Sequence, residues 1–214
     1  MPASRLHLVR HGEVHNPDRI LYGRLAGFHL SPAGREMAQA AADHVLGLGG
    51  TIREIRSSPL ERAQESAAPF AEALGIDPVL DERIIEPTNV FEGKRMRRAL
   101  RDPRNWHHLR RPSLPSWGEP YNAIVARMRA AMDESWHAVD TATGAAEEGD
   151  IVFVSHQAPI WMVHLSVAGL PLRHDPRTRR CTLSSVTTFE RAGDVWREIG
   201  YAEPASGGID LGAV

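Results

Sequence analysis

The sequence is poor in cysteine and in long apolar runs. Cys181 is the one cysteine in 214 residues, so a framework of internal disulfides is excluded. No apolar stretch approaches the roughly 20 residues of a membrane-spanning helix, and the N-terminus lacks the apolar centre of a secretory signal. These absences favour a cytoplasmic protein in a reducing compartment.

The sequence also lacks a strong excess of charge of either sign. Its formal net charge is -2 and its pI is about 6.6, so no overall field attracts it to nucleic acid or to a membrane. The G-x-S-x-G, P-loop and G-x-G-x-x-G signatures are absent as well. The composition is that of an ordinary globular chain, long enough for one substantial core. We therefore expect a single domain over residues 1–214.

Short apolar runs alternate with helical patterns along the chain. Ser31-Pro32 and Ser58-Pro59 resemble helix starts, and Gly75 resembles a helix stop. This alternation predicts a three-layer α/β/α sandwich with a mainly parallel central sheet. The expected strands are Arg5–Val9, Ile52–Ser57, 78–80 and Asp150–Ser155, with two more within Thr182–Glu190 and Val195–Tyr201. The later helices are Tyr121–Val139 and Ile160–Ala168.

Ionisable side chains follow two of the predicted strands. "LVRHGE" places Arg10 and His11 at the end of the first strand, and "VFVSHQAP" places His156 after the buried strand. In parallel sheets, ligands bind beyond the carboxyl ends of the strands. We expect these two stretches to meet at one edge of the sheet, near Arg62 in "SSPLERAQESA".

These residue types suit a phosphate ester. Two guanidiniums, from Arg10 and Arg62, can bind a dianion bidentately, and arginine keeps its charge at any working pH. A neutral imidazole can attack phosphorus, and a second imidazole can donate to the phosphoryl oxygens. Taken singly, His11 could cap a turn and Arg62 could be a solvated helix residue, so only their combination indicates a phosphate site.

The combination resembles the histidine phosphatase superfamily, which includes the cofactor-dependent phosphoglycerate mutases. RHGE after a strand, S-S-x-L-x-R-A before a helix, and V-S-H after a late strand carry the resemblance, which spans Leu6 to Tyr201. It implies a phosphoglycerate mutase-like fold and no cofactor. It makes His11 the nucleophile and Glu86 the general acid, assisted by Arg10, Arg62 and His156. Further substrate contacts are implied at Asn16, Arg24 and Gln157.

The sequence departs from the family pattern at three places. The segment before "FEG" is one residue short, so Glu82 and Glu13 compete with Glu86 as the general acid, and Glu86 could be an ordinary surface carboxylate. Asn16 stands one residue early and could be a plain turn residue before Pro17. "HQA" replaces the "HGG" of many members, which predicts a looser hold on phosphate by the backbone.

A basic, proline-rich insertion at about 93–120 interrupts the α/β rhythm. Residues 94–111 hold eight Lys or Arg and one Asp. Three interpretations are open: a solvated surface segment, a nucleic-acid patch, or a lid that adds cations over the site. We favour the lid, with Trp106, His107 and His108 as contacts to the leaving group. A metal site at the two histidines is disfavoured, because no set of ligands with zinc spacing accompanies them.

The leading hypothesis is a metal-independent phosphomonoesterase acting on a small anionic phosphorylated metabolite through a phosphohistidine at His11. A mutase that returns the phosphoryl group to an alcohol is the alternative, and a non-catalytic phospho-ligand-binding protein is the second. We expect no nucleic-acid or membrane partner. The sequence leaves the oligomeric state open, with a homodimer possible, and it predicts a short surface tail at about 202–214.

Overall fold

A six-stranded sheet forms the centre of the protein. The computed structural model describes residues 4–109, 118–142 and 149–205. The strands lie in the order β3-β2-β4-β1-β5-β6, and only the β1–β5 and β5–β6 pairs are antiparallel. The mainly parallel sheet is therefore confirmed. The strands are β1 Leu6–Arg10, β2 Ile52–Ser57, β3 Val79–Leu80, β4 Asp150–Ser155, β5 Val186–Ala192 and β6 Val195–Ala202.

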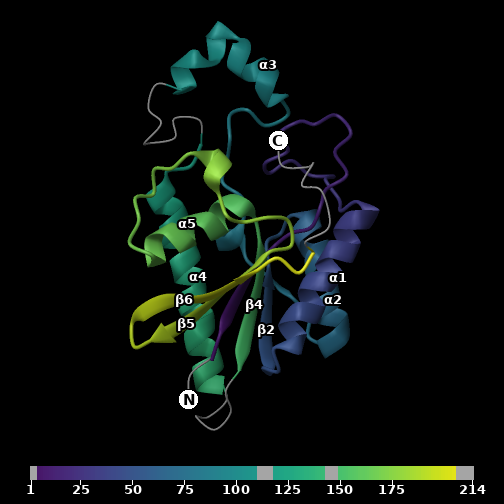
Figure 1. Ribbon diagram of the computed structural model, residues 1–214, viewed down its shortest axis with the longest axis vertical. Helices are drawn as coiled ribbons and strands as arrows, with labels where there is room; N and C mark the ends of the chain where they lie inside the picture. Colours follow the sequence, from purple (N-terminus) through teal and green to yellow (C-terminus); the bar gives the residue numbers. More distant parts are fainter. Residues whose placement is uncertain (1–3, 110–117, 143–148, 206–214) are drawn as a thin grey trace.

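Helices cover both faces of the sheet, which confirms the predicted three-layer sandwich. Figure 1 shows α1 (Pro32–Gly47) and α2 (Glu61–Leu74) on one side, and α4 (Tyr121–Ala142) and α5 (Gln157–Val167) on the other. Alternate residues of β4 enter the two cores, because successive side chains of a strand point to opposite faces. Val152 and Val154 pack with α1 and α2, whereas Ile151 and Phe153 pack with α4 and α5.

The register of the sheet brings three strand ends together. Arg10 of β1 lies opposite Ser155 of β4, and Ser57 of β2 lies opposite Val154. The residues that follow these strands, including His11, Ser58 and His156, therefore start from the same edge. This is the edge at which ligands bind in parallel α/β sheets.

Two helices begin at residues other than those predicted. The Ser58-Pro59 start was wrong, because α2 begins at Glu61 and the Ser58 hydroxyl lies 2.8 Å from Nε2 of His156. The Ile160 start was wrong too, because α5 begins at Gln157. Pro159 is tolerated inside its first turn, where backbone N–H groups have no intrahelical acceptor. The Ser31 cap was right: its hydroxyl accepts from the Gly34 N–H at 2.9 Å.

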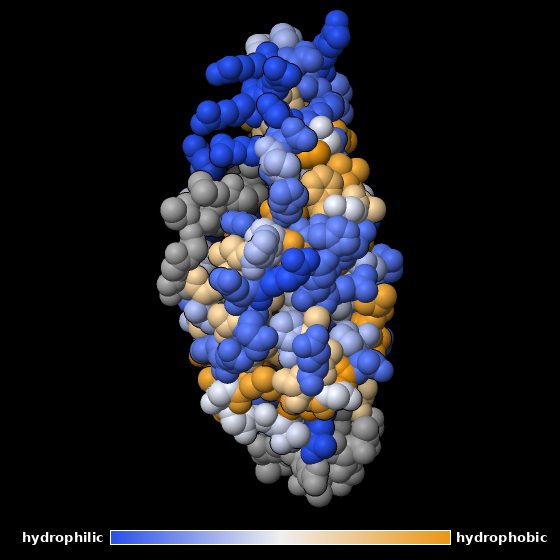
Figure 2. Space-filling view, turned by 90° about the vertical axis from the view of Figure 1, so that its right-hand side faces the viewer, coloured by the Kyte–Doolittle hydropathy of each residue, from blue (hydrophilic) through white to orange (hydrophobic). Residues whose placement is uncertain are grey.

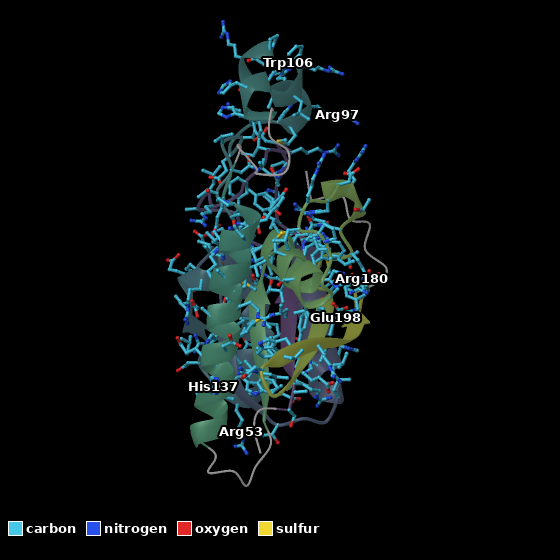
Figure 3. The ribbon with its side chains drawn as sticks, turned by 90° about the vertical axis from the view of Figure 1, so that its left-hand side faces the viewer. Arg53, Arg97, Trp106, His137, Arg180 and Glu198 are labelled. Atoms are coloured by element: carbon cyan, nitrogen blue, oxygen red, sulfur yellow. The ribbon has the colours of Figure 1, made fainter. Side chains whose placement is uncertain are left out.

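The basic insertion forms short helices that project from one end of the molecule. They are α3 (Met96–Arg101) and η2 (Pro103–Leu109), which stand beyond the strand ends in Figure 1, whereas η1 (Glu82–Ile84) precedes the insertion. Figure 2 shows strongly hydrophilic side chains at this end, and Figure 3 places Arg97 and Trp106 there. The lid, the single-domain boundary and the tail stay predictions; residues 110–117 of the insertion and 206–214 of the tail lie outside the described residues.

No helix among the described residues is both long and apolar enough to cross a lipid bilayer. The longest of them, α4, places Ile124, Met128 and Met132 in the core beneath the sheet.

Candidate active site

His11 sits directly beyond β1 in a position that fixes its proton. The residue is 3% exposed, and its backbone N–H donates to the Ser155 carbonyl at 3.1 Å. Its Nδ1 lies 2.7 Å from the Gly12 carbonyl oxygen, which can only accept a hydrogen bond. The proton is therefore assigned to Nδ1, which leaves the lone pair of Nε2 available. Burial, and then the charges of Arg62 and Arg10, hold the pKa of His11 well below its ordinary value.

Gly12 lets the His11 loop pack directly on the first turn of α1. A Cβ at Gly12 would collide with the Gly34 carbonyl oxygen, and a Cβ at Gly34 would collide with the Glu13 carbonyl oxygen. The Gly12 N–H donates to the Ser66 hydroxyl at 3.1 Å, which in turn donates to the Arg62 carbonyl at 2.7 Å. The loop is thus held between α1 and α2.

Two buried arginines lie beside this loop without carboxylate partners among the described residues. Arg10 is 2% exposed and donates from Nη1 to the Cys181 carbonyl at 2.6 Å. Arg62 is fully buried, donates from Nη2 to the Gly23 carbonyl at 2.6 Å, and packs over the Tyr22 ring at 4.7 Å. Nε of Arg10 and both Nε and Nη1 of Arg62 are buried without a described hydrogen-bond partner. Buried donors without acceptors are costly, so this arrangement suits an incoming anion.

His156 completes the cluster from the end of β4. Its ring centroid lies 5.1 Å from that of His11. The Leu60 N–H donates to the Ser58 hydroxyl at 3.4 Å, so this hydroxyl can donate its own proton to Nε2 of His156. The ring proton is then on Nδ1, which is buried and has no partner in the described chain. Burial, followed by Arg62, holds the pKa of His156 well below its usual value.

Glu86 is the carboxylate that lies among these arginines. Its Oε2 is buried with no hydrogen-bond partner in the part of the chain that the structure describes. Burial raises the pKa of Glu86, against the opposing charges of Arg62, Arg179 and Arg10. An uncharged carboxyl group can hold a proton for donation near neutral pH.

The two competing glutamates occupy other environments. Glu82 is exposed in η1. Glu13 accepts a hydrogen bond from the Ser31 hydroxyl at 2.6 Å and so supports the N-terminus of α1. Of the three candidates for the general acid, Glu86 is the one whose surroundings resemble a site for proton transfer.

The three candidate substrate contacts are tied to protein groups. The side-chain amide of Asn16 bonds both the N–H and the carbonyl of Ile20, so it closes its own turn. Arg24 donates to the Glu86 carbonyl at 2.5 Å and thereby holds the backbone of that loop. Gln157 donates to the Cys181 carbonyl at 3.3 Å, the same oxygen that Arg10 binds.

One residue at the site was missed by the sequence reasoning. Arg179 lies between α5 and β5, donates from Nε to Nε2 of His174 at 2.8 Å, and reaches Gln157 with Nη1 at 3.5 Å. "DPRTRRC" holds three arginines with nothing in the pattern to separate Arg179 from Arg177 or Arg180. Among the residues with described positions, no three His, Cys, Asp or Glu side chains gather as metal ligands.

Comparison with known proteins shows which family and which solved structures this chain resembles. A family model described as the histidine phosphatase superfamily (branch 1) matches residues 6–203. Rv0525 of Mycobacterium tuberculosis is 47% identical over 206 residues, which are 95% of this chain and 98% of that protein. A probable phosphoglycerate mutase GpmB of Erwinia tasmaniensis is 25% identical, over 96% of this chain and 93% of its own. The solved complex of mycobacterial glucosyl-3-phosphoglycerate phosphatase Rv2419c with inorganic phosphate has a TM-score of 0.77 and 27% identity, over 95% of this chain and 99% of that chain.

Proposed function

The chain belongs to the histidine phosphatase superfamily, and from that premise we propose that it is a phosphomonoesterase working through a phosphohistidine at His11. The observation that carries the proposal is a neutral imidazole with a bare Nε2, flanked by Arg10 and Arg62. Neither arginine has a carboxylate partner among the described residues. A phosphate dianion would balance two such charges.

Substrate binding is the first step. Arg10 and Arg62 present N–H groups to the phosphoryl oxygens, and Nδ1–H of His156 donates a further hydrogen bond. These donors are fixed by the fold, so they need little rearrangement as negative charge grows on the equatorial oxygens. The neutral state of both histidines keeps the lone pair of His11 available while the arginines supply the positive charge.

Phosphoryl transfer to the protein is the second step. The lone pair of Nε2 of His11 forms the N–P bond, and the P–O bond of the ester breaks in line with it. The electron pair of that bond goes to the leaving oxygen, which takes the proton of Glu86. The Gly12 carbonyl stabilises the developing positive charge on the imidazole through the Nδ1–H hydrogen bond.

Hydrolysis of the phosphohistidine is the third step. Water attacks phosphorus, the N–P bond breaks, and its electron pair returns to Nε2 of His11. The Glu86 carboxylate takes the proton of the attacking water, so the acid of the second step is restored. Inorganic phosphate leaves, and every proton is accounted for by protein side chains and water.

Product analysis separates hydrolysis from the mutase alternative. With 3-phosphoglycerate as substrate, we expect inorganic phosphate and glycerate, with little 2-phosphoglycerate. The similarity to mycobacterial glucosyl-3-phosphoglycerate phosphatase, at 27% identity over 95% of this chain, supports hydrolysis. Rapid formation of 2-phosphoglycerate without phosphate release would reverse this ranking. Absence of turnover on a broad panel of phosphate esters would refute the proposal that the protein is an enzyme.

A further inference from the structure

Arg179 differs from Arg10 and Arg62 because it contacts the side chains of His174 and Gln157. Nδ1 of His174 bonds the Leu172 carbonyl at 2.8 Å, so Nε2 of His174 is the acceptor for Nε–H of Arg179. Nη1 of Arg179 makes a long contact of 3.5 Å to the Gln157 side-chain oxygen. Each of these two contacts uses one of the five N–H groups of the guanidinium. The other three N–H groups of Arg179 have no acceptor in the described part of the chain and can bind a ligand.

The neighbouring arginines of the same loop have acidic partners, and Arg179 has none among the described residues. Arg177 pairs with Asp175 at 2.6 Å, and Arg180 pairs with Glu198 on the flank of the molecule, as Figure 3 shows. Arg179 is partly buried, and burial lowers the pKa of its guanidinium. A desolvated cation without a counter-ion is costly, so the site favours an anion from outside.

Hydrogen bonds place Arg179 beside the site through Gln157, the residue that follows His156. It is the second-strongest of the arginine charges that act on Glu86, and Glu86 is the foremost charge acting on Arg179. The principal charges acting on His11, by contrast, are Arg62 and Arg10. Gln157 and the Cys181 carbonyl connect Arg179 to Arg10 at the floor of the site. Arg179 therefore adjoins Arg10 and Glu86 without being one of the charges that chiefly act on His11.

The other arginines near Glu86 are already paired with a carboxylate or assigned to the phosphoryl group. Arg127 binds Glu119 with Nε and Nη2 at 2.8 and 3.0 Å, and Arg24 reaches the same carboxylate at 3.5 Å. Arg10 and Arg62 match the two negative charges of the phosphoryl group. Arg179 is left as a cation next to Gln157, without a carboxylate partner among the described residues.

We propose that Arg179 binds a carboxylate carried by the leaving alcohol, so that the preferred substrates are phosphate monoesters with a second anionic group near the ester oxygen. This inference rests on the proposed phosphatase function. A planar carboxylate can accept two parallel hydrogen bonds from one guanidinium. Arg179 is then a specificity-determining residue, whereas Arg10 and Arg62 serve any phosphate ester.

The proposal is tested with pairs of phosphate esters. The two members of a pair differ only in the negative charge on the alcohol. The probes are phosphoglycolate, 3-phosphoglycerate and 4-carboxyphenyl phosphate, each compared with its uncharged carboxamide. For at least one pair, the wild-type kcat/KM should favour the carboxylate by about tenfold or more. Arg179→Gln should lower kcat/KM for that carboxylate roughly 10- to 100-fold and for its carboxamide less than threefold. Arg179→Lys, which keeps the charge without the planar fork, should recover part of the preference.

Arg177→Gln is the control, because it removes the same charge from the same loop at an exposed position. It should leave both members of each pair unchanged. Equal losses on carboxylate and carboxamide in Arg179→Gln would overturn the proposal and assign Arg179 to the phosphoryl group. A wild type without preference in all three pairs would also overturn it, with the phosphatase function intact. Failure to hydrolyse any of the six esters would instead count against the proposed function itself.

Discussion

At the residue scale, the chemistry depends on where two protons are held. The Gly12 carbonyl keeps one on Nδ1 of His11, and burial keeps the other on Glu86. The pKa of His11 is lowered and that of Glu86 is raised, and both shifts favour the form with neutral His11 and protonated Glu86. The activity of the free enzyme should rise with pH through the lower pKa and fall through the higher one.

Glu86→Gln tests the acid role through its dependence on the leaving group. Loss of the proton donor should lower kcat/KM for an alkyl phosphate about 10²- to 10⁴-fold. p-Nitrophenyl phosphate should lose far less, because its leaving phenolate needs little protonation. The fall of kcat/KM at high pH should vanish in the variant, since the amide does not titrate. Glu82→Gln, at an exposed position, serves as the control; an equal loss there, or losses independent of the leaving group, would refute the assignment.

Arg10→Lys tests whether the site needs the guanidinium geometry as well as its charge. Lysine cannot bond the Cys181 carbonyl and two phosphoryl oxygens from one rigid plane. We expect kcat/KM for an aryl phosphate to fall about 10²- to 10³-fold, nearly as far as in Arg10→Ala. Near-normal rates in the lysine variant, with folding checked by circular dichroism, would show that a point charge suffices.

Single residues were predictable where their chemistry stands out against a strand end. His11 and His156 follow buried strands, and the sequence itself places Arg10 beside His11. Arg179 could not be found this way, because its role depends on the lack of an ion-pair partner among the described residues and on contacts to His174 and Gln157. Such contacts arise only once the loop before β5 is folded against α5.

At the element scale, the site depends on the contact between the His11 loop and α1. The sequence marks the start of α1 through Ser31 and Pro32, but it gives no sign that Gly34 lies against the backbone of Glu13. Likewise, Ser58 looks like a helix cap in the sequence and instead orients His156. Both features follow from long-range packing, which local patterns do not encode.

Gly34→Ala tests this contact with a control in the same helix. The added methyl would collide with the Glu13 carbonyl oxygen, so the loop that carries His11 has to move. We expect a loss of roughly 1–3 kcal/mol in the free energy of unfolding, together with a fall in kcat/KM. Gly47→Ala adds its methyl where no atom lies within 4 Å and should be neutral or slightly stabilising. Equal behaviour of the two variants in thermal unfolding and kinetics would contradict the packing argument.

At the scale of the whole molecule, the layers and the site edge were predictable because strands and helices alternate. The basic insertion was not, since its proline-rich sequence predicts no regular element. The structure gives it the short helix α3, with exposed arginines beyond the strand ends (Figure 1). Its role as a lid over the substrate stays a prediction.

Charge neutralisation tests the contribution of this insertion. If α3 attracts anionic substrates, Arg97→Gln with Arg101→Gln should lower kcat/KM at low ionic strength and weaken its dependence on salt. The control is Arg53→Gln with Arg197→Gln, which removes the same charge from other exposed positions; Figure 3 shows Arg53 at the opposite end from Arg97. An identical salt dependence in both double variants would assign α3 to another task.

The central claim is that His11 carries the phosphoryl group, and a phosphoenzyme trap tests it most directly. Wild type and His11→Ala are incubated with an aryl phosphate, quenched in alkali to preserve phosphohistidine, and compared by intact mass and peptide mapping. The account predicts an acid-labile phosphoryl adduct on wild type, located at His11, and none on the variant. Turnover by wild type without an adduct under any quench time, or an adduct that persists in His11→Ala, would contradict it.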